Sequence, residues 1–339
     1  MNDRLQTTAQ TAQQPQDPFS LITDMVMNIV SSHALLVATD LGVAEALGDG
    51  EETAASLARK IGANADKLSR ILRLLASKGI FEQRGDKFRN TPTSVLLRKD
   101  HPQSMRGLVR AIHTGAPVLA HLEHAVRTGR PAAEMVDPDG LWVWLAKNPE
   151  LGRAFDDAMV SKSVTTIPAI VAAYDFSRFS TIADIGGGKG HLIKAVLDAT
   201  PKARGILFDL PQVVERAKGA ASSRLTIQGG DLFKDRLPAA DAYLLMNVIH
   251  DWSDEESVAI LKAVRKAASV QSRLLLMETP LPESGQADLP LAVDILMMAY
   301  ASGRERKLSE YQTLLAASGW RFERAIDAAG GAIIESSPA

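Results

Sequence analysis

The sequence predicts an α/β protein with a doubly wound, mostly parallel sheet in its C-terminal half and a smaller, mostly helical domain before it. Three observations support this prediction. Short apolar segments alternate with helical segments after Phe176, a helix–turn–helix–hairpin pattern occupies residues 53–89, and residues 101–165 have a helical pattern with proline- and glycine-containing breaks. With 339 residues, the chain is long enough for two domains.

The predicted strands of the C-terminal half are short and apolar, and most are separated by helical segments. They cover residues 181–185, 205–208, 225–227, 242–246 and 273–277, and the helices cover residues 191–199, 211–220 and 254–268. A helix over 309–318 and an apolar segment at 332–334 complete the pattern. This alternation favours a parallel sheet covered on both faces, with ligands bound beyond the carboxyl ends of its strands.

The N-terminal pattern over residues 18–100 is typical of a winged helix. Thr53 is a predicted N-cap, two short helices follow, and two strands flank a turn at Gly85. The basic residues of the second helix, Lys67, Arg70 and Arg73, leave a DNA-binding interpretation open beside a structural one. The formal net charge of -2 favours the structural interpretation, and we expect no nucleic-acid partner.

The first residues carry no targeting signal that we recognise. Residues 1–17 are polar, without the basic start and apolar run of a signal peptide, and are predicted to be a disordered tail. No apolar stretch approaches the roughly 20 residues needed to cross a bilayer, so we expect no membrane association. Absence of cysteine fits a cytoplasmic protein.

Two helical faces have both a core and a functional interpretation. Apolar residues recur at helical spacing from Phe19 to Val30 and continue, after a break, from Leu35 to Leu47. This face is either core or a subunit interface. Phe155 and Met159 lie four residues apart and share a helix face, where they are core residues or line an apolar pocket.

The turn after the first predicted strand reads Asp-Ile-Gly-Gly-Gly-Lys-Gly from Asp184. Its glycines let a ligand approach the backbone, and the following helix offers unpaired N–H groups. The spacing fits neither G-x-G-x-x-G nor a P-loop. The aspartate two residues before Gly186 resembles motif I of class I S-adenosylmethionine-dependent methyltransferases. In that interpretation Gly186 and Gly188 contact the cofactor and Asp184 helps to hold its ammonium end. A tight turn with a dinucleotide, or with no ligand, is the alternative.

Two further acidic positions follow the next strands. Asp209 ends the second strand, before Leu210, where a carboxylate can accept both hydroxyls of a ribose. Asp231 follows the third strand, where it could accept the adenine amino group while Leu232 and Phe233 cover the ring.

His250 stands where the fourth strand ends and a helix begins, in the run His-Asp-Trp-Ser-Asp-Glu. A histidine there can act as a general base, because its unperturbed pKa of about 6.5 suits neutral pH. A lone histidine more often has a structural role, so the assignment of His250 as a base depends on the surrounding motifs.

Together these motifs resemble the plant-type and bacterial small-molecule O-methyltransferases. The resemblance rests on the run from His250, on Phe-Asp-Leu-Pro at 208–211, on Gly-Gly-Asp-Leu-Phe at 229–233 and on Gly-Arg-Glu-Arg at 303–306. It implies a Rossmann-like class I methyltransferase domain over 166–339, a helical connector lining the acceptor pocket over 101–165, and a winged-helix-like dimerisation domain over 18–100. It also implies S-adenosyl-L-methionine as cofactor and a homodimer. We expect no metal, because none of the seven histidines has a carboxylate or a second histidine at convincing ligand spacing.

The resemblance further implies a division of roles within the site. His250 takes the proton from an acceptor hydroxyl, and Glu278 and Glu305 flank the imidazole. Asp251 orients the substrate or the backbone near the base, while Phe155 and Met159 clamp the acceptor ring. The expected acceptor is a small phenolic natural product. Methylation of carbon or nitrogen on the same scaffold stays an alternative, as does a DNA-binding regulator that senses a ligand.

Overall fold

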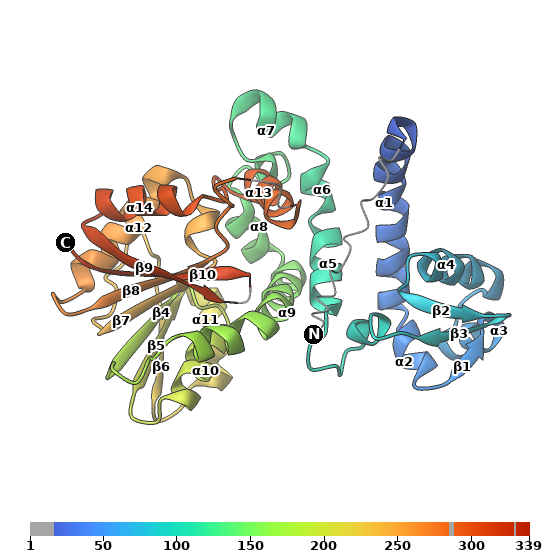
Figure 1. Ribbon diagram of the computed structural model, residues 1–339, viewed down its shortest axis with the longest axis horizontal. Helices are drawn as coiled ribbons and strands as arrows, with labels where there is room; N and C mark the ends of the chain where they lie inside the picture. The colour runs from blue at the N-terminus through green and yellow to red at the C-terminus, as the bar shows by residue number, and fades with distance from the viewer. Residues whose placement is uncertain (1–16, 285–287, 329) are drawn as a thin grey trace, which may run out of the picture. The chain divides into compact units, whose positions relative to one another are not determined.

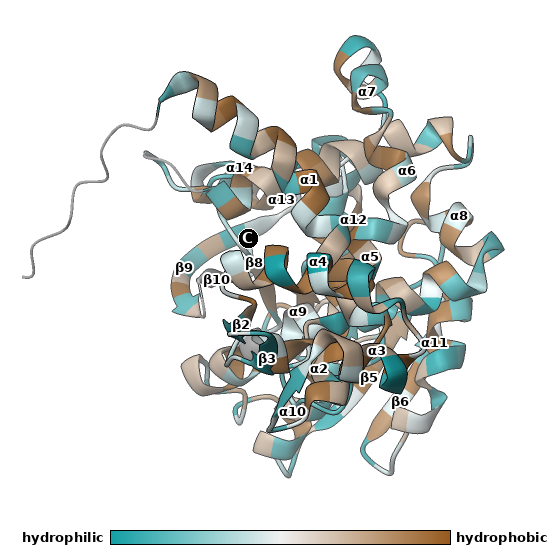
Figure 2. Cartoon of the chain, turned by 90° about the vertical axis from the view of Figure 1, so that its right-hand side faces the viewer, coloured by the Kyte–Doolittle hydropathy of each residue, from teal (hydrophilic) through white to brown (hydrophobic). Residues whose placement is uncertain are grey.

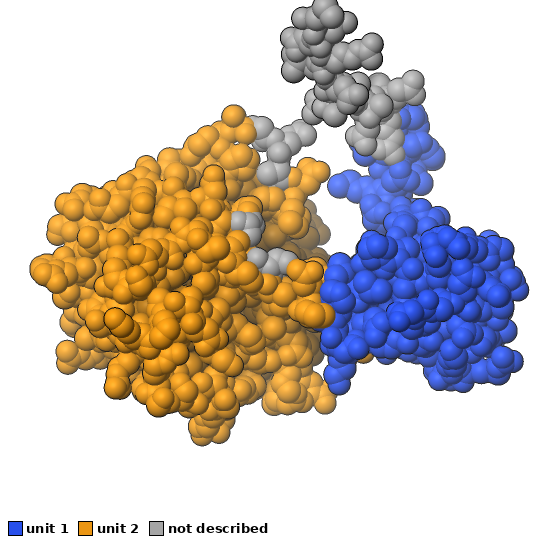
Figure 3. All heavy atoms as spheres, turned by 60° about the horizontal axis from the view of Figure 1, so that its bottom comes forward, with its two compact units in different colours: residues 1–101 blue, residues 102–339 orange. Residues whose placement is uncertain are grey.

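A computed structural model describes residues 17–284, 288–328 and 330–339 of the chain. The chain divides into two compact units, residues 1–101 and residues 102–339, coloured separately in Figure 3. Apart from Asp17, the predicted disordered tail over residues 1–17 lies outside the described residues. Asp17 itself is the N-cap of the first helix, where its carboxylate accepts a hydrogen bond from the Ser20 N–H.

The first unit contains the predicted helix–turn–helix–hairpin pattern (Figure 1). Its elements are α1 (Pro18–Asp40), α2 (Val43–Leu47), β1 (Glu51–Thr53), α3 (Ala54–Ile61), α4 (Ala65–Ser77), β2 (Phe81–Arg84), β3 (Lys87–Asn90) and η1 (Ser94–Leu97). The three strands form one antiparallel sheet in the order β1-β3-β2. Thr53 caps α3 as predicted, by accepting a hydrogen bond from the Ser56 N–H. Leu57, Leu72 and Phe81 are among its fully buried side chains.

The apolar residues predicted to recur at helical spacing from Phe19 lie on α1, which runs uninterrupted to Asp40 before the chain turns at Gly42, in the left-handed region. The expectation that no stretch is long enough to cross a membrane is wrong, since α1 meets that test by length and composition. Apolar residues recur along α1 in Figure 2. Its exposed apolar side chains are Phe19, Leu21, Ile22, Met25, Val26, Met27, Ile29, Val30 and Val37.

The second unit begins with helices that precede the sheet. They are α5 (Arg106–Thr114), α6 (Ala116–Leu119), α7 (Leu122–Thr128), η2 (Ala132–Met135), α8 (Leu141–Lys147) and α9 (Pro149–Ala173). α9 contains Pro168 and runs through residues 165 and 166 without interruption. The helical connector and the sheet domain therefore share one helix.

A seven-stranded sheet forms the centre of the second unit, in the order β6-β5-β4-β7-β8-β10-β9 (Figure 1). Its strands are β4 (Thr181–Ile185), β5 (Arg204–Asp209), β6 (Leu225–Gly229), β7 (Ala242–Met246), β8 (Arg273–Glu278), β9 (Trp320–Ala328) and β10 (Gly331–Pro338). The first five are parallel, and β10 pairs antiparallel with β8 and β9. The five predicted parallel strands are thus confirmed. The strand order reverses between β4 and β7, which is where such sheets bind ligands.

The remaining helices connect the strands. They are α10 (His191–Ala199), α11 (Pro211–Ala217), η3 (Lys218–Ala220), η4 (Ile249–Asp251), α12 (Asp254–Ala267), α13 (Asp288–Tyr300) and α14 (Leu308–Ala317). One face of the sheet packs on α9 and α10, through Ile170 and Ile193. The other packs on α12 and α14, through Leu261 and Leu315. Because both faces are covered, the central strands are apolar throughout, as the sequence indicated.

Candidate functional site

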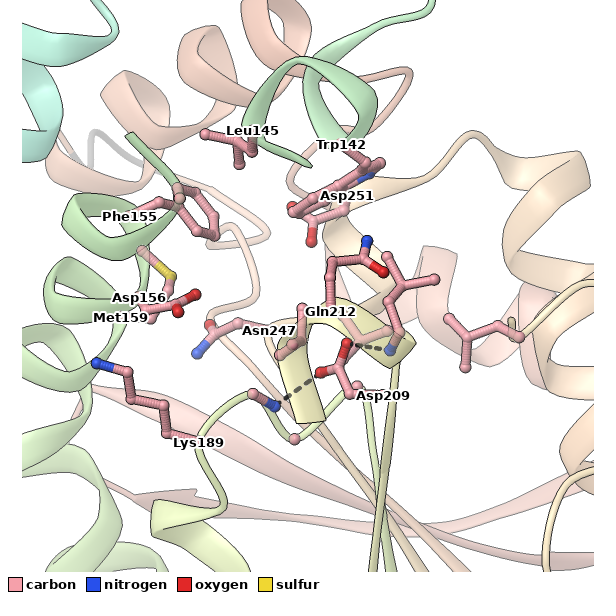
Figure 4. A pocket seen from close by; sticks show the side chains of 18 of the residues that line it. Trp142, Leu145, Phe155, Asp156, Met159, Lys189, Asp209, Gln212, Asn247 and Asp251 are labelled. Carbon is pink, nitrogen blue, oxygen red and sulfur yellow. Dashed lines mark hydrogen bonds between the residues drawn. The ribbon is translucent and has the colours of Figure 1, made fainter. Parts of the chain in front are cut away.

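A cavity of about 470 Å³ opens beyond the carboxyl ends of β4, β5 and β7, beside α8 and α9 (Figure 4). The structure brings every predicted cofactor residue to its wall. They are Asp184, Gly186, Gly188, Asp209, Leu210, Asp231, Leu232 and Phe233. The predicted acceptor residues Phe155, Met159 and Asp251 line the same cavity. One apolar cavity therefore gathers segments that are far apart in the sequence.

The glycine turn between β4 and α10 needs its glycines. Gly186 and Gly188 have φ values of 70° and 57°, in the left-handed region that disfavours side chains. A Cβ on Gly187 would lie 2.5 Å from the Asp184 Cγ and 2.5 Å from a methyl group of Leu207. Side chains are therefore excluded from this turn by the backbone conformation at Gly186 and Gly188 and by the lack of space at Gly187.

Asp184 lies beneath this turn, almost completely buried. One of its carboxylate oxygens accepts the N–H of Ile193 at 3.3 Å. Burial raises the pKa of Asp184 to about 7, the Ile193 N–H opposes that rise, and the negative charge of Asp209 adds to it. A cationic group placed at this part of the wall would stabilise the ionised carboxylate.

Asp209 lies at the end of β5, lines the cavity and binds the glycine turn that follows β4. Its two carboxylate oxygens accept the N–H of Gly188 at 2.8 Å and the N–H of Leu210 at 2.7 Å, drawn as dashed lines in Figure 4. Burial raises its pKa, and the two N–H groups oppose that rise. Because a carboxylate oxygen has two lone pairs, each oxygen keeps one acceptor position for a ligand hydroxyl.

Asp231 is held at the cavity by its own turn. It accepts the N–H of Phe233 at 2.9 Å and pairs with Lys234 at 2.8 Å, and the hydrogen bond from Lys234 lowers its pKa. The Phe233 ring contacts the Trp252 ring edge-on, with centroids 4.8 Å apart. An ionised acceptor and an apolar ring therefore stand side by side, as adenine recognition would require.

The three predicted catalytic residues form a buried cluster next to the cavity. The His250 Nδ1 lies 2.7 Å from a Glu305 oxygen and 4.0 Å from a Glu278 oxygen. Since an ionised carboxylate only accepts hydrogen bonds, Nδ1 is assigned as the donor and Nε2 carries the lone pair. Nε2 lies 3.6 Å from the Asp251 carboxylate, which lines the cavity; His250 itself is buried behind that wall.

Burial changes the acidity of this cluster. Burial raises the pKa of Glu278 to about 7, His250 opposes that rise, and the neighbouring Glu305 adds to it. One Glu278 oxygen accepts the Ile249 N–H at 3.0 Å, so this carboxylate supports the backbone of the histidine turn as well. Two buried carboxyl groups therefore lie close to one imidazole.

The segment containing Glu305 is pressed against the histidine turn. A Cβ on Gly303 would lie 1.9 Å from the carbonyl oxygen of His250 and 2.4 Å from the carbonyl carbon of Asp251. Only glycine allows this approach. The Gly-Arg-Glu-Arg run thus places Glu305 against the imidazole from a neighbouring loop.

Sequence reasoning missed an aromatic row along the cavity wall. Trp142 of α8 contacts Phe155 edge-on at 5.8 Å and lies 6.3 Å from Trp252, which in turn contacts Phe233. The row joins the predicted acceptor residues to the predicted adenine residues. Trp142 had no motif to reveal it, although two tryptophans in one short helix were a weak signal.

Two ion pairs, also missed, fasten α9 beside the cavity. Asp156 binds Arg216 of α11 at 2.6 Å, and Asp157 binds Lys189 of the glycine turn at 2.8 Å. Asp156, Lys189 and Arg216 line the cavity. The helix that carries Phe155 and Met159 is therefore tied to the turn expected to hold the cofactor.

Comparison with known families identifies both parts of the chain. The profile of the O-methyltransferase domain matches residues 119–321, and that of the O-methyltransferase dimerisation domain matches residues 23–100. The chain belongs to the O-methyltransferase family. It is an S-adenosylmethionine-dependent methyltransferase. In its sequence a mostly helical dimerisation domain comes first, and a domain with the class I methyltransferase fold follows. The DNA-binding interpretation of the N-terminal unit finds no support, because that unit matches the dimerisation domain.

Methyltransferases of Lysobacter and Streptomyces are among the proteins similar to this chain. The chain is 37% identical to phenazine O-methyltransferase PhzM of Lysobacter antibioticus, over 94% of this chain and 96% of that protein. It is 36% identical to the mitomycin biosynthesis 6-O-methyltransferase of Streptomyces lavendulae, over 92% of each. It is also 34% identical to the 8-amino-8-demethylriboflavin N,N-dimethyltransferase of Streptomyces davaonensis, over 84% of this chain and 85% of that protein.

Solved structures of O-methyltransferases have the same fold. The crystal structure of LaPhzM matches with a TM-score of 0.89 and 36% identity, covering 95% of this chain and all of that one. Another match is an O-methyltransferase from neocarzinostatin biosynthesis, solved in complex with S-adenosylmethionine and 2-hydroxy-5-methyl naphthoic acid. Its TM-score is 0.78 and its identity 32%, and the match covers 91% of this chain and 96% of that one. The family cofactor, S-adenosylmethionine, is thus bound in a protein of this fold.

Proposed function

We propose that this O-methyltransferase methylates a hydroxyl of a small phenolic acceptor, with His250 as the general base. The observation that carries the proposal is the 2.7 Å hydrogen bond between the His250 Nδ1 and Glu305, which leaves the lone pair on Nε2, toward Asp251 and the cavity side. S-adenosylmethionine supplies a sulfonium methyl group that is already activated toward nucleophiles. The protein therefore has to bind, orient and deprotonate the acceptor.

Deprotonation is the step that needs a base. A phenol has a pKa near 10, so at neutral pH it is mostly protonated and a weak nucleophile. His250 takes this proton at Nε2, and Glu305 stabilises the imidazolium through the Nδ1–H. The Glu278 carboxyl group lies 4.0 Å from Nδ1 and adds a second negative charge when it is ionised. Asp251, at the cavity wall beside Nε2, orients the acceptor hydroxyl toward the base.

The residues around the glycine turn fit the cofactor. Gly186 and Gly188 open the backbone, and Asp209 keeps an acceptor position on each oxygen for the two ribose hydroxyls. Asp231 would accept the adenine amino group beside Leu232 and Phe233. Asp184 would provide the negative charge opposite the ammonium end, and that cation would oppose the effect of burial on its pKa.

The acceptor would lie against α8 and α9. Phe155 and Met159 form an apolar wall, and Trp142 extends it, so a flat ring is the shape that this side of the cavity fits. The relatives support an aromatic acceptor, because the neocarzinostatin enzyme was solved with a naphthoic acid. Holding oxygen, methyl carbon and sulfur in line can supply several kcal/mol of the rate enhancement.

Matched acceptors would test this proposal. Compounds that share one fused aromatic ring system but carry a hydroxyl, an amino group or a methyl ether would be incubated with isotope-labelled cofactor, and products followed by mass spectrometry. We expect label on the hydroxyl compound and none on the methyl ether. Transfer to the amino compound alone would favour the N-methyltransferase alternative, for which the riboflavin-analogue relative is the specific observation.

We further propose that the chain is a homodimer through the apolar face of α1. Met25 and Ile29 on this face are 76% and 61% exposed, which costs free energy in water unless a partner covers them. The match to a dimerisation domain over residues 23–100 makes a second copy the expected partner. A subunit interface would also explain why α1 is long and apolar enough to cross a membrane, with no membrane needed. A soluble, cytoplasmic enzyme is the corresponding prediction for localisation.

The dimer can be tested by placing charge on that face. The double substitution Met25→Asp and Ile29→Asp is expected to yield a folded monomer in sedimentation equilibrium, because two carboxylates per copy would have to be buried. Ser77→Asp, an exposed position at the end of α4, is the control and should stay dimeric. A double variant that remains a dimer would contradict the assignment of this face.

A further inference from the structure

The most heavily bonded buried cation among the described residues stands directly after Glu305 in the chain. Arg306 is completely buried, and its guanidinium binds Asp254 through Nε at 2.9 Å and Nη2 at 2.8 Å. Asp254 is 60% exposed, so much of its charge is screened by water. A buried arginine paired with a hydrated partner gains little stability from that pair, because its own desolvation opposes the attraction.

Two further hydrogen bonds of Arg306 go to the backbone of the histidine turn, and a longer one, of 3.4 Å, goes to the carbonyl of Arg304. Its Nη1 donates to the carbonyl of Ile249 at 3.1 Å, and its Nη2 donates to the carbonyl of Trp252 at 2.7 Å. These carbonyls belong to the residues immediately before and after the His250–Asp251 pair. One planar group therefore holds both ends of the turn that presents the base.

Consecutive residues thus hold the turn in different ways. Glu305 binds the imidazole at Nδ1, and Arg306 binds the main chain on either side of it. Gly303 lies against the backbone between these points. A lysine could not reproduce the contact of Arg306, because its single ammonium cannot reach two carbonyls and a carboxylate with fork geometry.

We propose that Arg306 is a positioning residue for His250, holding the turn from Ile249 to Trp252 so that the imidazole stays in register with Glu305 and with the acceptor hydroxyl. The inference rests on the proposed role of His250 as base. It predicts that Arg306 affects proton removal and leaves cofactor binding alone, because the cavity wall does not include it. Displacing a catalytic group by about 1 Å can cost about 10²-fold in rate.

The test compares Arg306→Ala and Arg306→Lys with Arg304→Gln. Arg304 is the matched control, because it lies in the same loop, is half-exposed and pairs with Glu310 away from the turn. We expect both Arg306 variants to bind S-adenosylhomocysteine with unchanged Kd in calorimetry, with kcat about 10²-fold lower and acceptor KM little changed. Added guanidinium should restore part of the kcat of Arg306→Ala. Arg304→Gln should match the parent in all measurements.

A double variant separates this inference from the proposed function. If Arg306 acts through His250, then adding Arg306→Ala to His250→Gln should slow the enzyme no further. A further additive loss would overturn the positioning role, and so would full kcat in both single Arg306 variants. Normal turnover by His250→Gln alone would instead overturn the proposed base. If Arg306→Ala does not fold, Arg306→Lys decides: a kcat equal to the parent's contradicts the inference.

Discussion

Replacing His250 with glutamine is expected to lower kcat by about 10²- to 10⁴-fold, the usual contribution of a positioned general base. The substitution keeps a polar side chain of similar size in the buried site but removes the lone pair that accepts the proton. Cofactor affinity should not change, because His250 is not among the residues that we propose to hold the cofactor. The measurement is single-turnover methyl transfer from labelled cofactor, together with calorimetric Kd for the cofactor.

Acceptors of different pKa would test whether His250 acts by removing a proton. A phenol carrying electron-withdrawing groups is already ionised at neutral pH and does not need a base, so the loss in His250→Gln should shrink as the acceptor pKa falls. His121→Gln is the control, since His121 lies before α7 and outside the cavity wall. An equal loss for acidic and ordinary phenols would contradict proton removal as the role of His250.

Replacing Asp209 with asparagine is expected to weaken cofactor binding strongly. The carboxylate accepts two backbone N–H groups, so an amide in its place must aim an NH₂ group at one of these donors. It also loses a charged acceptor for the ribose hydroxyls. Hydrogen bonds to charged groups contribute about 1.5–3 kcal/mol each, which corresponds to a rise in Kd of about 10- to 150-fold for one bond lost.

Calorimetry with S-adenosylhomocysteine would measure this effect, with Asp198→Asn on the exposed side of α10 as the control. The pH dependence gives a second readout. Because burial raises the pKa of Asp209, affinity should fall with decreasing pH earlier than it would for an ordinary aspartate. A Kd for Asp209→Asn close to that of the control would place the ribose elsewhere.

The parallel sheet and its ligand turn could be predicted because local patterns determine them. Short apolar strands alternate with helices, and glycines at 186 and 188 adopt backbone angles that other residues avoid. β9 could not be predicted, because charged residues such as Arg321 and Glu323 interrupt the apolar pattern of this edge strand. Charged side chains on an edge are typical, since they discourage pairing with other chains.

The parts of the site that escaped prediction depend on tertiary contacts. Nothing in the sequence shows that Arg306 is buried while the nearby Arg304 is half-exposed. The row from Phe155 through Trp142 to Trp252 likewise joins segments that meet only after folding. Motifs therefore identified groups that act chemically, whereas the side chains that shape the cavity and hold those groups required coordinates.

The proposed acceptor side of the cavity and the proton-accepting cluster come from different parts of the fold. Phe155, Met159 and Trp142 project from α8 and α9. His250 stands on η4, Glu278 at the end of β8 and Glu305 on the loop before α14. Selection for new substrates could therefore be confined to two helices, with the deprotonation chemistry left intact. A library of variants at these helical positions would diversify ring size while every member keeps the same reaction.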